Sequence, residues 1–206
     1  MTELEKERTE EINALINEMT LEEKVGLLLH ESSGVERLGI KPYNWWNEAL
    51  HGVARNGPAT VFPQTIGLAA TFDTELAQKE YEAISDEARA KYNESQKIND
   101  NGQFRGLTYW TPNINIVRDS RWGRAQETFG EDPYLTSQMG IAAVKGLQGD
   151  DKENLKLAAC AKHFAVHSGP ESTRHTANVK PSKKDLWETY LPAFKALVDE
   201  GVESVM

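Results

Sequence analysis

Apolar residues recur at helical intervals near the N-terminus and predict two short helices. The first stripe consists of Ile12, Leu15, Ile16 and Met19. Thr20 followed by Glu23 is a capping-box pattern, which indicates a second helix that continues through residues 25–29. We expect both helices to pack on the outside of the fold.

Two longer helices and a divided third helix follow along the chain. Asp73 is a predicted N-cap, and the inner face of its helix is Ala77, Tyr81, Ile84 and Ala88. Asp132 and Pro133 start the next helix, whose inward residues are Leu135, Met139, Ala142 and Leu147. The third helical stretch, over residues 182–201, is divided by Pro192. Its inner stripe is Phe194, Leu197 and Val198.

Apolar runs between these helices predict buried strands. The runs cover residues 65–71, 107–117, 157–166 and 202–206. Strand, loop and helix therefore recur roughly four times at spacings of about 40 residues, and charged or aromatic residues follow the strands. The pattern predicts an α/β fold of the (β/α) TIM-barrel type, with its site at the carboxyl ends of parallel strands. A doubly wound sheet is the alternative, and the lack of a glycine fingerprint weakens it.

Composition narrows the functional classes. The chain has 206 residues, enough for one domain, and a formal charge of −9 without a basic tract, so we expect no nucleic-acid partner. No run of about 18 apolar residues is present, so we expect no membrane span. The N-terminal sequence MTELEKERTEE is too charged for a secretory signal, which favours a cytoplasmic location.

The single cysteine, Cys160, excludes an internal disulfide and is interpreted as a small core residue. No zinc-ligand spacing or phosphate-binding glycine loop occurs, so neither a metal nor a cofactor is expected.

Charge is densest in residues 113–133, NINIVRDSRWGRAQETFGEDP. Three arginines there, Arg118, Arg121 and Arg124, precede three acids, Glu127, Glu131 and Asp132. Guanidinium groups facing carboxylates suit recognition of a polar substrate, but an ion-pair network that holds a loop explains the charges equally well.

Two further stretches combine residues that suggest a binding site. In residues 39–57, Trp45 and Trp46 stand beside Glu48; they can grip a sugar through indole faces and a carboxylate, or they can be core tryptophans next to a surface acid. In the apolar run 157–166, Lys162 and His163 interrupt a buried strand, which is costly unless they are paired or lie at its open end. Adjacent strand residues face opposite sides, so these two share a ligand only if the backbone bends.

The loop at residues 167–179 also carries charge, from Glu171, Arg174 and His175. It covers a pocket or is an ordinary exposed loop, and the sequence does not separate the two. His51, by contrast, is interpreted as a structural, hydrogen-bonding histidine.

Four blocks of the chain resemble glycoside hydrolase family 3. They are YNWWNEALHGVAR, TVFPQTIGLAATFD, LTYWTPNINIVRDSRWGRAQETFGEDPYLTS and LAACAKHFAVHSGPESTRH. The resemblance runs from about Met19 onward, and WGR, GEDP and KHF are its most specific motifs. It implies a TIM-like barrel and exo-attack on β-linked sugars with retention of configuration. The NWWNEALHG form resembles the β-xylosidase and β-glucosidase branches.

The resemblance also implies roles for particular residues. Glu48, Arg124, Lys162 and His163 would bind the sugar in the first subsite, with non-proline cis peptides bending the backbone at the KHF motif. Weaker substrate-site candidates are Arg55, Arg174 and Trp46. Asp119 and Arg121 would support the loop.

The catalytic residues of such an enzyme have no counterpart in these residues. A retaining glycosidase needs two carboxyl groups, and the resemblance places the nucleophilic aspartate on a later barrel strand and the acid/base in a second domain. We therefore expect residues 1–206 to be the N-terminal portion, about half, of a barrel, with no catalytic residue of its own. The expected reaction of the longer enzyme is hydrolysis of terminal non-reducing β-D-glucosyl or β-D-xylosyl residues from oligosaccharides or glycosides. The alternative is a noncatalytic sugar-binding or vestigial half-barrel. The expected partners are the carbohydrate substrate and either the remaining barrel and C-terminal domain or, through open strand edges, other copies of the chain.

Overall fold

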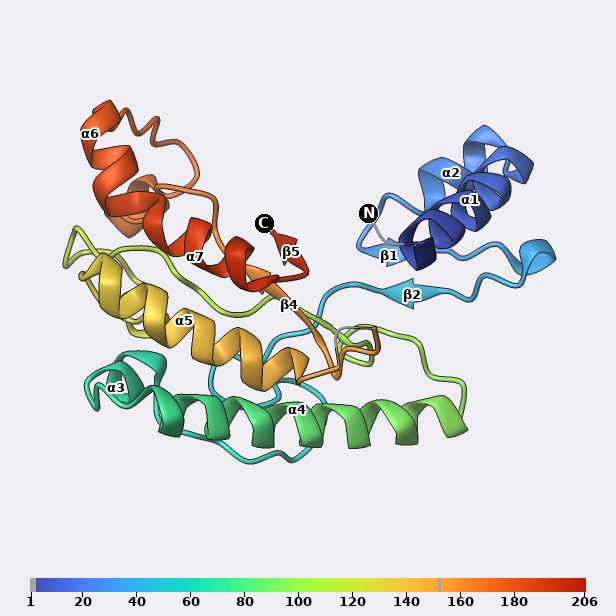
Figure 1. The fold of residues 1–206 in the computed structure, drawn as a ribbon, viewed down its shortest axis with the longest axis horizontal. Coiled ribbons are helices and arrows are strands. Elements are labelled where there is room, and N and C mark those ends of the chain that lie inside the picture. Colours follow the sequence, from blue (N-terminus) through green and yellow to red (C-terminus); the bar gives the residue numbers. More distant parts are fainter. Residues whose placement is uncertain (1–2, 152) are drawn as a thin grey trace.

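The computed structural model describes residues 3–151 and 153–206. Figure 1 shows helices α4, α5 and α7 stacked on one side of the short central strands, with a separate helical arm at the N-terminal end. The helices are α1 (Glu3–Glu18), α2 (Leu21–Gly26), α3 (Thr65–Ala69), α4 (Thr74–Lys97), α5 (Pro133–Gln148), α6 (Lys183–Asp185) and α7 (Pro192–Glu200). Short 3-10 turns are η1 (Glu36–Leu38), η2 (Ala125–Glu127) and η3 (Glu171–Thr173), and η4 (Leu186–Tyr190) is a π-helical turn. The strands are β1 (Glu31–Ser32), β2 (Tyr43–Asn44), β3 (Thr108–Tyr109), β4 (Ala158–Ala161) and β5 (Ser204–Val205).

The central sheet is parallel, in the order β3-β4-β5. Helix α5 connects β3 to β4, and α7 lies between β4 and β5 in the chain, so each crossover returns through a helix. Helix α4 packs on α5, and α5 packs on α7. On the other side of β3, Asn47 pairs in parallel with Tyr109. The predicted parallel β/α architecture is confirmed, because successive strands and successive helices are neighbours in the same order.

The core forms where α4, α5 and α7 meet the strands. Tyr81 and Ile84 of α4, Met139 and Leu147 of α5 and Leu197 of α7 are fully buried. Both predicted caps are present: the Asp73 and Asp132 carboxylates accept hydrogen bonds from the third backbone N–H beyond them, at 2.9 and 2.6 Å. The two long helices therefore begin where the sequence places them.

Helices α4 and α5 approach so closely that only a glycine fits at one crossing point. A β-carbon added to Gly146 of α5 would lie 2.5 Å from the Gln78 carbonyl oxygen and 2.8 Å from the Glu82 nitrogen, both backbone atoms of α4. The Ser85 hydroxyl donates to the Gly146 carbonyl oxygen at 2.9 Å across the same contact. Backbone therefore packs directly against backbone there.

The sequence analysis predicted one strand too many and made the other strands too long. Residues 65–71 contain helix α3 rather than a strand, with Leu68 N donating to Gln64 O at 3.1 Å in the helical pattern. The periodicity of a short apolar run does not distinguish a helix from a strand. Thr65, at the start of this helix, is buried, and its hydroxyl group donates to the Leu50 carbonyl oxygen at 3.3 Å. The observed strands are also spaced more widely than predicted, because α3 takes the place of one of them.

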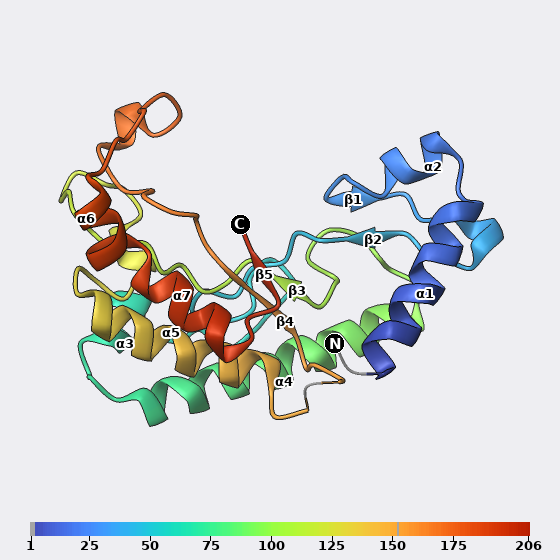
Figure 2. The same cartoon turned by 45° about the horizontal axis from the view of Figure 1, so that its top comes forward.

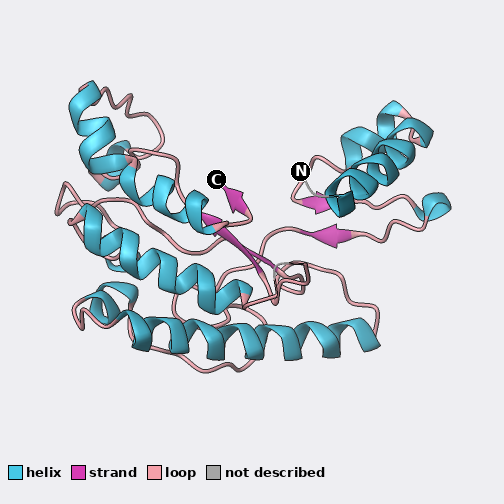
Figure 3. Cartoon of the chain, in the orientation of Figure 1, coloured by secondary structure: helices cyan, strands magenta, loops and turns pink. Residues whose placement is uncertain are grey.

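Two other predicted strands are real but short, as the long loops of Figure 3 make clear. Strand β3 covers only Thr108–Tyr109, since Pro112, which follows a cis peptide bond, has no N–H for a ladder. Strand β4 ends at Ala161, directly before Lys162. On α7, the predicted inner residue Val198 is 56% exposed, so the inner stripe consists of Phe194 and Leu197.

The N-terminal helices lie at the outer edge of the fold, but they project from it as a separate arm and, within the residues that the structure describes, do not pack on the other helices as expected (Figure 2). The predicted capping box is present: Thr20 and Glu23 exchange side-chain to backbone hydrogen bonds at 2.8 and 3.3 Å. Arg37 ties the arm together by pairing with Glu23 at 2.6 Å and donating to the Glu18 carbonyl oxygen at 2.7 Å. Most apolar side chains of the arm face solvent, and Leu28, for example, is 84% exposed, whereas Met19 is buried.

Candidate functional site

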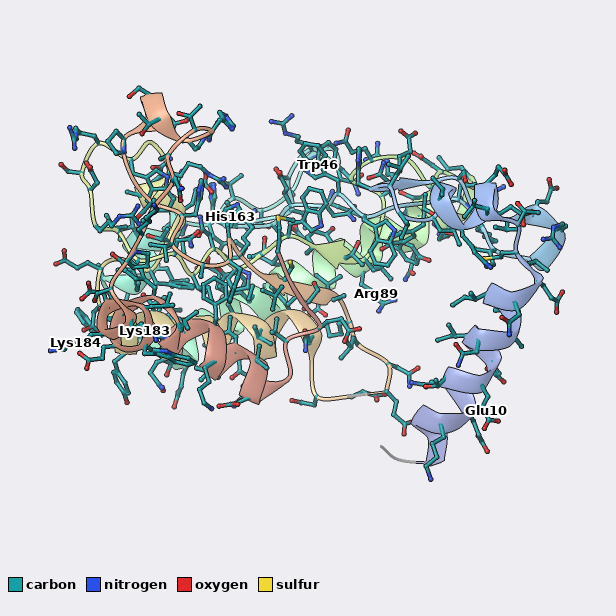
Figure 4. All side chains as sticks on the ribbon, turned by 90° about the horizontal axis from the view of Figure 1, so that it is seen from above. Glu10, Trp46, Arg89, His163, Lys183 and Lys184 are labelled. Carbon is teal, nitrogen blue, oxygen red and sulfur yellow. The ribbon has the colours of Figure 1, made fainter. Side chains whose placement is uncertain are left out.

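The candidate side chains come from three separate segments that meet at the carboxyl ends of the parallel strands. Glu48 follows Asn47, which pairs beside β3, and Lys162 and His163 follow the last residue of β4. Arg124 comes from the charged loop beyond β3, at the start of η2. Figure 4 shows Trp46 and His163 over the middle of the molecule, far from Glu10 in the N-terminal arm.

His163 is held by Asn115 on one side and by Arg124 on the other. Its backbone N–H donates to Asn115 Oδ1 at 2.9 Å, and its Nδ1 lies 3.0 Å from the same oxygen. Its Nε2 lies 3.2 Å from Arg124 Nη1. Burial, reinforced by the charges of Arg124 and Lys162, lowers the pKa of His163 to about 3, so the imidazole is neutral near pH 7.

Arg124 is fixed by Glu127 through a bidentate pair. Its Nε donates to the Glu127 carboxylate at 3.0 Å, and its Nη2 donates at 2.6 Å. Both side chains are about four-fifths buried, with 23% and 20% exposed. The forked geometry holds the guanidinium plane and leaves Nη1 directed toward His163. The charged loop thus contains an ion pair that holds it in place, and the same ion pair orients Arg124 as a candidate substrate-binding residue.

Among the residues whose burial is described, Lys162 is the most buried lysine or arginine, with 4% of its surface exposed. Across residues 3–151 and 153–206 its ammonium group has no hydrogen-bond or salt-bridge partner. Burial and the nearby Arg124 lower the pKa of Lys162, while the charges of Glu48 and Glu127 oppose that shift. The ammonium thus lies among one cation and two carboxylates, and its donors are free for a ligand.

Glu48 and Trp46 form a joint unit beside this cation. Trp46 Nε1 donates to Glu48 Oε1 at 2.8 Å, and the Trp46 ring stacks on Trp110 with 5.1 Å between ring centroids. The indole faces and the carboxylate are therefore held together, as sugar binding by this pair requires. Trp45 is separate from the unit: it is 47% exposed and contacts Tyr43 edge-on.

The two weaker arginine candidates lie differently. Arg174 pairs with Glu171 at 3.2 Å, and its charge contributes to the low pKa values of His163 and His167, which places it beside the cluster. Arg55 is exposed, and its guanidinium group stacks on Phe104 at 5.7 Å. The structure does not bring Arg55 into contact with the four main candidates.

The loop after the KHF motif covers a cavity of about 470 Å³. Its lining includes two arginines, Arg118 and Arg174, together with His167 and Trp122. His167 connects the cavity to the cluster, because its ring centroid is 4.9 Å from that of His163. The sequence left open whether this loop covers a pocket or is an ordinary exposed loop, and in the structure its residues line a pocket. None of the four main candidates belongs to that lining.

The residues that the sequence analysis interpreted as structural, His51, Cys160, Asp119 and Arg121, have structural roles in the fold. His51 Nδ1 lies 2.9 Å from the Phe62 carbonyl oxygen, and Cys160 is a buried free thiol. Asp119 pairs with Arg121 at 2.8 Å and supports the loop. Within the described residues, no three His, Cys, Asp or Glu side chains are grouped as metal ligands, and no helix is long and apolar enough to cross a membrane.

The sequence interpretation missed the residues that hold the cluster in place. Asn115 and Trp110 both lie in the segment taken as one apolar strand, and Glu127 was assigned no role beyond its charge. Asn115 gave a usable signal, because a polar amide within the apolar run INIV must find buried partners.

Comparison with known proteins decides the family. Residues 12–206 match the glycosyl hydrolase family 3 N-terminal domain. The chain belongs to this family. A xylan 1,4-β-xylosidase of Xylanibacter ruminicola is 56% identical over 93% of the chain. A solved GH3 exo-β-xylosidase, in complex with a xylobiose aziridine probe, superposes over 94% of the chain with a TM-score of 0.84 and 36% identity. A solved β-glucosidase of Listeria innocua superposes over 96% with a TM-score of 0.75 and 29% identity.

The chain spans about a quarter of the length of the relatives that it matches. It covers 23% of the Xylanibacter protein, 26% of the xylosidase structure and 32% of the Listeria structure. The family's N-terminal domain is a TIM-type barrel, and this chain comprises only part of it. The predicted fold class is therefore confirmed.

Proposed function

We propose that this chain supplies the first-subsite sugar-binding surface of a retaining glycoside hydrolase that removes terminal non-reducing β-D-xylosyl or β-D-glucosyl residues. One observation carries the proposal: Glu48, Arg124, Lys162 and His163, from three segments, converge at the carboxyl ends of parallel strands. Such a cluster offers both donors and acceptors to a ring of hydroxyl groups, and its indole stack offers an apolar face.

Of the two sugars, xylose is the favoured substrate. The relative that is 56% identical is named as a xylan 1,4-β-xylosidase, and a relative from Arabidopsis thaliana that is 45% identical is named as a β-D-xylosidase. Among the solved structures, the exo-β-xylosidase superposes with a TM-score of 0.84, and two β-glucosidase structures of Listeria innocua superpose with TM-scores of 0.75 and 0.62. Sequence similarity therefore supports a pentosyl substrate, with the glucosyl substrate as the weaker choice.

The carboxylates of the cluster serve to position other groups. Glu127 is engaged by Arg124 through two nitrogens, and Glu48 accepts from Trp46. A retaining reaction needs a nucleophile and an acid/base roughly 5 Å apart, one of them free to attack the anomeric carbon. We therefore assign both reacting groups to other parts of a longer protein, and to this chain the residues that orient the sugar and gain hydrogen-bond strength in the transition state.

Sugar binding to the full chain tests the proposal directly. Methyl β-D-xyloside and methyl β-D-glucoside are titrated by calorimetry into the chain and into its Lys162→Met variant. A hydrogen bond to a charged group contributes about 1.5–3 kcal/mol, so Kd for the xyloside should rise roughly 10- to 100-fold in the variant. Lys195→Met is the matched control, because Lys195 is 71% exposed on α7. Equal affinity of Lys162→Met and the parent chain would refute the assignment.

Hydrolysis is followed in parallel with nitrophenyl β-D-xyloside. The chain alone should bind without turnover, because the reacting carboxyl groups are assigned elsewhere. Turnover by the chain alone at an enzymatic rate would show that assignment to be wrong. Binding that persists without turnover when the chain is combined with the rest of the longer protein would favour the noncatalytic alternative.

The remaining partner of this chain is proposed to be further barrel strands. Strand β5 pairs with β4 on one side, and within the described residues its other edge has no strand partner. Val205 and Met206 on this strand end are 45% and 40% exposed. An uncovered parallel edge is a template for strand addition, so the isolated chain is expected to associate with itself through it.

A further inference from the structure

One buried amide makes four contacts with the segment that carries His163. Asn115 is 1% exposed, and its Nδ2 donates to the carbonyl oxygens of His163 at 2.8 Å and of Ala165 at 3.3 Å. Its Oδ1 accepts from the His163 backbone N–H at 2.9 Å and lies 3.0 Å from His163 Nδ1. Every hydrogen-bonding position of this amide is thus directed at the tip of β4.

These contacts settle which way the amide points. Carbonyl oxygens only accept hydrogen bonds, so the atom facing the two of them must be the NH₂ group. A backbone N–H only donates, so the atom facing the His163 amide must be the oxygen. The oxygen is therefore also the atom beside Nδ1, and Nδ1 must carry a proton to make that contact favourable.

The opposite side of the ring leads to the same tautomer independently. Arg124 Nη1 lies 3.2 Å from Nε2, and a guanidinium group donates but does not accept. Nε2 must therefore present its lone pair. A proton on Nε2 would face the guanidinium charge, which is itself fixed by Glu127.

We propose that Asn115 is a positioning residue that fixes His163 as the neutral Nδ1–H tautomer, with Nε2 as a hydrogen-bond acceptor in the sugar site. What this means for a sugar rests on the proposed function: a hydroxyl group that takes the place of Arg124 at Nε2 has to donate its proton there. Its oxygen lone pairs then remain for a cation, which the unpartnered ammonium of Lys162 supplies. In the first subsite, at least one sugar hydroxyl group therefore donates its proton to His163 Nε2 and accepts a hydrogen bond from Lys162.

Nitrogen-15 NMR of the full chain tests the tautomer without any sugar. Long-range proton–nitrogen correlation spectra show which imidazole nitrogen carries the proton, and loss of signals in His163→Gln assigns this ring among the five histidines. Near pH 7 the spectrum should show a protonated Nδ1 and an unprotonated Nε2 for His163. A protonated Nε2 in the parent chain would overturn the proposal.

Asn115→Asp separates positioning from mere packing. The substitution keeps an oxygen for Nδ1–H and adds a negative charge, so the tautomer should persist while the pH midpoint of the His163 signals moves upward. Asn154→Asp is the control, since Asn154 is an exposed asparagine paired with Asp151 and should leave His163 unchanged. An unchanged midpoint in a folded Asn115→Asp chain, with backbone spectra like those of the parent, would count against the assignment.

A third variant covers the case in which the charged substitution disturbs folding. Asn115→Ser removes the amide but introduces no charge, and it is combined with Arg124→Met, because Arg124 facing Nε2 favours the same tautomer by itself. Arg124→Met alone should keep the Nδ1–H tautomer, and the double variant should show a mixture of both tautomers. A pure Nδ1–H tautomer in the double variant would show that Asn115 does not fix it. The tests also separate the two proposals: the expected tautomer without any xyloside-induced change at His163 would refute the sugar site alone, and a xyloside response from the wrong tautomer would refute the role of Asn115 alone.

Discussion

Replacing Gly146 by alanine tests the close packing of α4 on α5. The added β-carbon would lie 2.5 Å from the Gln78 carbonyl oxygen, 2.7 Å from Tyr81 Cβ and 2.8 Å from the Glu82 nitrogen. Two of these atoms are backbone, so the helices must separate rather than a side chain rotate. Overpacking costs up to about 3 kcal/mol, and alanine regains about 1 kcal/mol of helix propensity, so the net loss should be about 2 kcal/mol. For a chain of this size that corresponds to a fall in Tm of about 4–8 °C.

Gly67→Ala provides the matched control for this prediction. Gly67 also lies in a helix, but its added β-carbon would meet nothing nearer than Pro63 Cβ at 4.0 Å. The same change of residue should therefore leave the stability equal or raise it by up to about 1 kcal/mol. Both variants are unfolded thermally and in urea at one protein concentration, because self-association shifts the apparent stability. The reasoning is refuted if Gly146→Ala is as stable as Gly67→Ala.

Two further predictions concern pH and association. Glu80 is only 7% exposed, and one of its carboxylate oxygens has no hydrogen-bond partner among the described residues. Burial raises the pKa of Glu80 to about 7. The carboxyl group has an ordinary pKa near 4.5 in the unfolded chain, so its ionisation in the folded chain reduces stability as the pH rises from about 4.5 to 7. Glu80→Gln should therefore stabilise the chain at pH 8 and progressively less toward pH 4.5. A gain in thermal stability that does not depend on pH would contradict this. Light scattering after gel filtration should show oligomers of the isolated chain that Val205→Lys reduces; a monodisperse parent monomer would rule out association through β5.

The helices were the most predictable part of the fold, for a local reason. Asp73 and Asp132 each cap a backbone N–H three residues ahead, and the stripes behind them are long enough to fix the helical period. Residues 65–71 lacked such length, and their helix depends on contacts with Leu50 that lie outside the run. Val198 follows the helical stripe and yet faces solvent, because the stripe is wider than the surface that α5 covers.

The candidate site was only partly predictable. Lys162 stood out as a lysine in an apolar run, but the residues alone left its role open, and the family resemblance supplied the grouping with Glu48 and Arg124. The structure brings these side chains together because strands that are distant in sequence are neighbours in the sheet. Asn115 stands out as a polar residue within an apolar run, but three of its four partners are main-chain atoms, which the sequence does not identify.

The amide of Asn115 also has a consequence for protein engineering. Because it joins the segment after β3 to the segment after β4 through main-chain atoms, the two segments form one structural unit. Transplanting the KHF tripeptide into another barrel would transfer the lysine and the histidine without the asparagine that orients the histidine. A successful transfer would have to move the NINI and KHF segments together, as a matched pair of strand tips.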